Sequence, residues 1–141
     1  MDNTLGHGIR KDFTDRRVWD LSGYEANYIH LDYRFGFDCL GTGDRHGYLS
    51  ITINVPFRLL SPDGEYVYDP EHLETIAGAL RILHRSALTL TVYASRRLDT
   101  KFDGGFGLTV EKHAQYETWE ARGQDELADI AFLCSPHDGP P

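Results

Sequence analysis

The chain is poor in cysteine and in long apolar runs, and each shortage excludes a class of structure. Only Cys39 and Cys134 occur among 141 residues, and neither lies in a Cys-x-x-Cys or Cys/His motif. We therefore expect two free, buried thiols and no disulfide framework. No run of about 18 apolar residues is present, and residues 1–17 lack the apolar segment of a signal peptide. The sequence predicts a cytoplasmic protein without a membrane span.

Positive charge is scarce as well. The chain has 14 Lys and Arg against 22 Asp and Glu, which gives a formal net charge of −8. Nucleic acids and anionic membranes attract clustered positive charge, so we expect neither as a partner and expect a basic protein instead. The 7 histidines form no H-x-H or HExxH pattern, so the sequence predicts no metal and no cofactor. No nucleophile motif or phosphate-binding loop indicates a catalytic residue.

Alternation of apolar and polar residues with period two is the main pattern that is present. It predicts one long strand over residues 27–40 and another over residues 49–59, separated by a glycine-rich loop. An antiparallel register about this loop pairs every apolar residue with another apolar residue, and a slip by one would expose them all. The predicted pairs are Cys39–Leu49, Phe37–Ile51, Phe35–Ile53, Tyr33–Val55, Leu31–Phe57 and Ile29–Leu59.

A hairpin and a helix complete the prediction. The Asp103-Gly104-Gly105 turn lies between two alternating segments, which is typical of a β-hairpin, and a third strand over residues 115–121 would make a meander. Asp69 as N-cap and Pro70 at the first helical position predict a helix over about residues 70–85. Its apolar stripe would be Leu73, Ile76, Ala77, Leu80 and Leu83.

These elements predict an α+β fold. It would have a single antiparallel, strongly curved, meander-rich sheet of about six to eight strands, with the helix of residues 70–85 packed on one face. Residues 18–134 would form the single domain, residues 1–17 a flexible N-terminal arm and residues 135–141 a disordered tail.

Charged residues that the alternation turns away from the core are the candidate partner surface. His30 and Asp32 share one strand face, a spacing that also occurs in metal and acid–base sites. In the predicted register, however, Arg58 lies near His30 and would oppose a metal ion, which favours a surface that faces a partner. The candidate surface consists of His30, Asp32, Arg34, Asp38, Asp44, Arg45, His46 and Arg58.

Two segments carry a resemblance to a known group of proteins. Residues 102–110 (FDGGFGLTV) and 115–123 (QYETWEARG) resemble small uncharacterised bacterial proteins, common in actinobacteria, in which an Asp-Gly hairpin and a Tyr-Glu-x-Trp strand close an α+β domain. The helix start at residues 69–73 is similar too, and the resemblance covers residues 18–134. Families of this kind include proteins that look like immunity partners of polymorphic toxins. The resemblance implies no catalytic residue.

Three functions are compatible with this sequence. We expect first a non-enzymatic protein-binding module, an immunity-type inhibitor that presents an acidic surface to a basic toxin. The second is a small-ligand-binding cup, enzymatic or not, because a filled core and an enclosed cavity have the same apolar pattern. Its pocket would be lined by Tyr33, Phe35 and Trp119. The third is a homo-oligomeric accessory subunit, such as a homodimer, with an apolar patch around Thr89, Thr91 and Tyr93.

Overall fold

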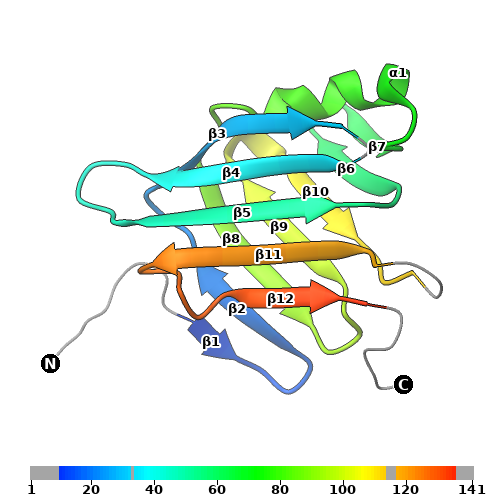
Figure 1. The fold of residues 1–141 in the computed structure, drawn as a ribbon. Helices are drawn as coiled ribbons and strands as arrows, with labels where there is room; N and C mark the ends of the chain where they lie inside the picture. Colours follow the sequence, from blue (N-terminus) through cyan, green and yellow to red (C-terminus); the bar gives the residue numbers. More distant parts are fainter. Residues whose placement is uncertain (1–9, 33, 114–116, 136–141) are drawn as a thin grey trace, which may run out of the picture.

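Two antiparallel β-sheets packed face to face make up the protein in its computed structural model, which describes residues 10–32, 34–113 and 117–135 (Figure 1). The seven-stranded sheet contains, in spatial order, β1 (Arg10–Asp12), β2 (Arg16–Asp20), β8 (Ala87–Tyr93), β9 (Leu98–Phe102), β10 (Gly107–Val110), β6 (Phe57–Ser61) and β7 (Gly64–Tyr68). The five-stranded sheet contains β12 (Ala131–Cys134), β11 (Trp119–Asp125), β5 (Gly47–Ile53), β4 (Phe35–Gly41) and β3 (Tyr24–Leu31). The helical segments are α1 (Leu73–Ile76), η1 (Ala77–Ile82) and η2 (Asp103–Gly105).

The predicted α+β fold with a single sheet is wrong. The apolar face of each sheet is covered by the other sheet, and strands of the rear sheet cross behind those of the front sheet (Figure 1). Alternation shows which residues of a strand face inward, but it does not show which strands share a sheet. The same pattern therefore fits one sheet under a helix and two sheets that cover each other.

The predicted α-helix over residues 70–85 is wrong, both in the type of helix and in the side chains that are buried. One turn of α-helix, α1, continues as the 3₁₀-helix η1, which has three residues per turn. The side chains that reach the core are spaced accordingly and are Ile76, Ala79 and Ile82. Leu80 and Leu83 of the predicted stripe are 43% and 37% exposed. The segment lies beside β3 and β7, where it borders the space between the sheets and leaves both outer sheet faces uncovered (Figure 1).

Both predicted long strands are divided. The predicted strand over residues 27–40 is divided between β3, which ends at Leu31, and β4, which begins at Phe35, and these two strands pair with each other. Residues 49–59 form β5 and β6, which lie in different sheets on either side of a crossing at residues 54–56. Pro56 at this crossing has no N–H to donate to a strand neighbour, which is a physical reason for the ladder to stop there.

The predicted register holds for the strands that do pair. Cys39 lies opposite Leu49, Phe37 opposite Ile51 and Phe35 opposite Ile53 in β4 and β5. The predicted pairs Leu31–Phe57 and Ile29–Leu59 are wrong, because Leu31 and Ile29 pair within the β3–β4 hairpin, opposite Phe35 and Phe37 respectively. The predicted pair Tyr33–Val55 is not tested, because Tyr33 lies outside the described residues. Phe57 meets Phe35 from the opposite sheet instead, with ring centroids 5.0 Å apart.

The hairpin between β9 and β10 is confirmed, and the meander is wrong. Gly104 (φ 75°) and Gly105 (φ 82°) adopt the left-handed conformation that glycine tolerates without steric cost. After β10, however, the chain leaves the seven-stranded sheet, and β11 pairs with β5 and β12 in the other sheet. Residues 115 and 116 of the predicted third strand lie outside the described residues.

The core between the sheets contains both tryptophans and both cysteines. Trp19 and Trp119 are 0% and 1% exposed. Cys39 and Cys134 are free and buried, as predicted, and burial raises the pKa of the Cys39 thiol to about 12. Cys39 therefore remains a protonated thiol at neutral pH and behaves as a small apolar core residue.

The first two strands start inside the segment that the sequence assigns to an arm. β1 and the first two residues of β2 lie within residues 10–17, at one edge of the seven-stranded sheet. Residues 1–9 and 136–141 lie outside the described residues. Within the described ranges, no helix has the length and apolar composition needed to cross a membrane.

Candidate functional site

The structure separates the eight residues of the predicted partner surface into four locations. His30 and Asp38 lie on the outer face of the five-stranded sheet, and Asp32 and Arg34 lie in the β3–β4 turn. The β4–β5 loop carries Asp44, Arg45 and His46. Arg58 is on β6 in the other sheet, where it forms ion pairs with Glu111 (2.9 Å) and Glu65 (3.5 Å).

His30 and Asp38 form a small polar cluster with Tyr48. The Tyr48 hydroxyl donates to Asp38 Oδ2 at 3.0 Å, and His30 Nε2 lies 3.7 Å from Asp38 Oδ1. Burial, followed by the bond to Asp38, raises the pKa of Tyr48, so the phenol stays a donor. Asp38 Oδ1 itself is buried without a hydrogen-bond partner among the described residues. The cluster has acid–base residues but lies on the outer strand surface, where the His30 side chain is 39% exposed.

The β4–β5 loop is held by its neighbours. The side chain of Arg45 is 22% exposed and contacts Gly23 and Gly41, while Asp44 is 88% exposed. The carbonyl of His46 accepts the backbone N–H of Glu126 at 3.0 Å. Arg45 and His46 therefore tie this loop to the adjacent turns, which gives them a structural part in this end of the sandwich.

The residues expected to line an internal pocket lie mainly in the core. Phe35 is 0% exposed and stacks on Phe57. The indole Nε1 of Trp119 donates to the Arg96 carbonyl at 2.8 Å, and its edge borders a shallow cavity of about 270 Å³ next to Phe132. Tyr33 lies outside the described residues.

A cavity that the sequence did not indicate opens where the chain crosses between the sheets. It has a volume of about 490 Å³, and its described lining contains three carboxylates and neither Lys nor Arg. We call it the acid-lined cavity; its lining residues are Asn54, Val55, Pro56, Asp69, Glu71, His113 and Glu117. They come from three chain segments, after β5, after β7 and before β11.

In the acid-lined cavity, the carboxylate of Asp69 is held by two contacts with neighbouring residues. Its Oδ1 accepts the backbone N–H of Glu71 at 3.0 Å, and its Oδ2 lies 2.9 Å from Nδ1 of His72. These two contacts lower the pKa of Asp69, and the Asp69 carboxylate raises the pKa of His72. Asp69 was expected to cap a long helix; it stabilises the turn before α1 instead.

The other polar groups of this cavity are mostly acceptors. Glu71 and Glu117 are exposed and form no ion pair within the described part of the chain. Asn54 donates through Nδ2 to the Glu117 carbonyl at 3.3 Å, and its Oδ1 is buried without a partner among the described residues. A lining of this kind is suited to a group that brings several N–H donors and a positive charge.

A larger groove, of about 830 Å³, runs over the outer face of the seven-stranded sheet. Its centre is Asp99, which Arg97 holds with two hydrogen bonds of 3.0 and 3.1 Å from Nε and Nη2. Burial, and then the Asp99 charge, raise the pKa of the adjacent Tyr93. Arg97 and Asp99 neutralise each other, and the other charged residues of this lining, among them Lys101 and Asp103, are of both signs, whereas those of the acid-lined cavity are carboxylates.

Comparison with known proteins identifies the family. Among the described residues, no group of three or more His, Cys, Asp and Glu side chains is placed to hold a metal ion. No curated protein and no solved structure matches the chain. A family model matches residues 18–139, which include every strand from β3 to β12. The chain therefore belongs to DUF6188, a family of unknown function.

Proposed function

We propose that this protein is a non-enzymatic binding module that receives a basic side chain of a protein partner in the acid-lined cavity. One observation carries the proposal: the cavity is lined by the carboxylates of Asp69, Glu71 and Glu117, and its described lining contains no Lys or Arg.

The chemistry of this lining favours an ammonium or guanidinium group. Carboxylates are acceptors only, and Lys and Arg side chains are donors only, so the two sets are complementary. A cationic side chain that enters the cavity would donate to the carboxylate oxygens of Glu71 and Glu117, which form no ion pair within the described part of the chain, and would neutralise part of the local charge.

The overall charge supports the same kind of partner. A formal net charge of −8 accelerates encounter with a basic protein over distances of about a Debye length. Together with the resemblance to immunity partners of polymorphic toxins, this favours an immunity-type inhibitor that binds a basic toxin. We propose as well that the protein is cytoplasmic and comes from an actinobacterium.

A pair of charge-matched variants tests the cavity directly. The probe is a fluorescein-labelled hexa-arginine peptide, with hexa-glutamate as the negative control, and binding is measured by fluorescence anisotropy. Glu71→Gln with Glu117→Gln removes two charges from the cavity. Asp44→Asn with Asp125→Asn removes two exposed charges beyond the opposite end of β5. We expect the cavity pair to weaken peptide binding about tenfold or more, and the control pair to change it about twofold or less.

The same variants test whether a natural partner protein binds through the acid-lined cavity. Basic proteins encoded by the neighbouring genes would be purified and titrated into the protein in a calorimeter. We expect one of them to bind with a dissociation constant of about 1 μM or lower, and the cavity pair to lose this binding. Equal weakening by both variant pairs would mean that attraction is spread over the whole surface, and would contradict the proposal. Absence of any basic protein that binds at micromolar concentration would contradict it as well.

A further inference from the structure

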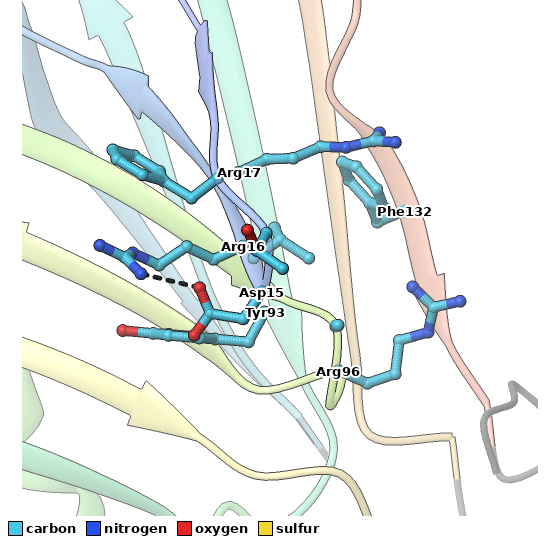
Figure 2. Close-up of a pocket in the computed structure, with 10 residues that line it drawn as sticks. Asp15, Arg16, Arg17, Tyr93, Arg96 and Phe132 are labelled. Atoms are coloured by element: carbon cyan, nitrogen blue, oxygen red, sulfur yellow. Dashed lines mark hydrogen bonds and ion pairs between the residues drawn. The ribbon is translucent and has the colours of Figure 1, made fainter.

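A further cavity, of about 290 Å³, is lined mainly by arginine and aromatic side chains (Figure 2). It lies where the β1–β2 turn and the β8–β9 connection meet β12 of the other sheet. We call it the arginine pocket; the residues that define it are Phe13, Arg16, Arg17, Tyr93, Arg96 and Phe132. Its charge is opposite in sign to that of the protein as a whole.

The three arginines of this pocket are not equivalent. Arg16 Nη1 bonds to Asp15 Oδ1 at 2.8 Å, and its guanidinium lies 4.3 Å from the centroid of the Phe13 ring. Arg17 and Arg96 form no ion pair with any described residue. Figure 2 shows both of their side chains extending toward Phe132, whereas Arg16 extends the other way. Two guanidinium groups and one aromatic ring therefore line the same pocket, and no described carboxylate pairs with either guanidinium.

Arg96 is held in place at some conformational cost. Its φ of 72° is in the left-handed region, which a residue with a Cβ adopts at a cost of roughly 1–2 kcal/mol. The Arg96 carbonyl accepts the indole N–H of Trp119, which anchors this backbone in the core. Its Nε is buried and has no hydrogen-bond partner within residues 10–32, 34–113 and 117–135. A glycine would fit this backbone without strain, so the presence of arginine indicates a use for the side chain.

We propose that the arginine pocket binds a small organic oxyanion, a carboxylate or a monophosphate, through Arg17 and Arg96. The planar guanidinium fork matches either head group with two parallel N–H···O bonds. Phe132 offers an apolar surface beside these donors, so a ligand with a flat apolar body is favoured over a bare inorganic ion. The volume of about 290 Å³ limits the ligand to a small molecule.

Three small probes of similar shape test the proposal on the full chain. Benzoate, phenyl phosphate and the neutral benzyl alcohol would be titrated separately, and binding would be followed by the NMR signals of the arginine Nε–H groups and by calorimetry. We expect at least one anion to bind with a dissociation constant of about 1 mM or lower, and benzyl alcohol to bind at least about tenfold more weakly. Binding of benzoate alone assigns a carboxylate, binding of phenyl phosphate alone assigns a phosphate, and binding of both assigns a shared oxyanion site.

Variants separate binding from folding. Arg17→Gln and Arg96→Gln should each weaken anion binding about tenfold. Arg122→Gln is the matched control, because Arg122 is exposed on β11 and pairs with Glu120 at 2.6 Å. Arg96→Gly removes the side chain and relieves the left-handed strain, so it should lose anion binding without lowering the unfolding temperature. Equal binding of benzyl alcohol, no binding of either anion, or unchanged affinity in Arg17→Gln and Arg96→Gly would overturn the proposal.

Discussion

The imidazole of His30 covers the backbone of Gly36, its direct partner across β3 and β4, so closely that a Cβ at position 36 would overlap the ring. The same imidazole approaches Asp38 on the next outward-facing position of β4. Gly36 therefore makes room for the one histidine of the predicted partner surface that lies on a sheet face.

Gly36→Ala should lower the free energy of unfolding by about 1–3 kcal/mol, because the ring must leave the strand surface. Denaturant unfolding measures this change. Gly107→Ala on β10 is the control: its Cβ would meet only ordinary contacts of 3.7 and 3.9 Å, and we expect a change within about 0.5 kcal/mol. His30→Ala in the Gly36→Ala background should recover part of the loss. Equal effects of the two glycine substitutions would contradict this account.

Phe57→Ala tests the contact between the two sheets. Phe57 is 2% exposed and stacks on Phe35 of the opposite sheet, so truncation leaves a cavity in the core and should cost about 3–5 kcal/mol. Leu60→Ala on the same strand is the control, because Leu60 is 54% exposed, and should cost less than about 1 kcal/mol. Chemical denaturation measures both variants, and the coupling energy follows from the single variants Phe35→Ala and Phe57→Ala together with the double variant. Additive costs at positions 35 and 57 would show that the two rings do not meet.

The pair formed by Asp69 and His72 should be visible in a pH titration. The hydrogen bond and charge of Asp69 raise the pKa of His72 above 6.5, and the bonds that Asp69 accepts lower its own pKa below 3.8. The His72 contribution to stability is complete below pH 6.5 and is lost as the pH rises through its raised pKa. The Asp69 contribution is present above pH 3.8 and is lost as the pH falls through its lowered pKa.

Asp69→Asn should therefore return the pKa of His72 toward its usual value, which NMR of the imidazole protons measures directly. Glu74→Gln is the control, because Glu74 raises the pKa of His72 only through its charge, and by less than the hydrogen bond and charge of Asp69 do. We expect a smaller decrease in the pKa of His72 for this variant. A decrease as large as that of Asp69→Asn would show that the hydrogen bond is not the main cause.

Two adjacent arginines should respond in opposite directions to truncation. Arg96→Gly relieves a positive φ and should raise the free energy of unfolding by about 0.5–1 kcal/mol. Arg97→Ala leaves the carboxylate of Asp99, whose side chain is 12% exposed, without its two hydrogen bonds. This loss should lower stability by about 1–3 kcal/mol. Thermal and denaturant unfolding compare the two variants, and a destabilised Arg96→Gly would contradict the strain at position 96.

Neither candidate site could be predicted from one segment of the sequence, because each is formed by several segments that lie far apart along the chain. The acid-lined cavity combines residues 54–56 with Asp69, Glu71, His113 and Glu117, and the arginine pocket combines the β1–β2 turn, β8, the β8–β9 connection and β12. His30 and Asp32 had suggested a site because they alternate on one strand, but Asp32 lies in the turn and bonds to Arg34. Spacing within a strand predicts which face a residue occupies, whereas a site requires several elements to converge.

The sequence by itself determined which residues are buried along most strands, the register of β4 against β5 and the hairpin at residues 103–105. These features follow from local rules, because strand alternation has period two and glycine alone accepts the turn without strain. Only the tertiary structure decided that the strands divide into two sheets, because the pattern from residue 49 to residue 59 alternates without interruption through the crossing at Pro56. Burial requires only that each apolar face be covered, and here a second sheet covers it with far more apolar area than a short 3₁₀-helix can supply.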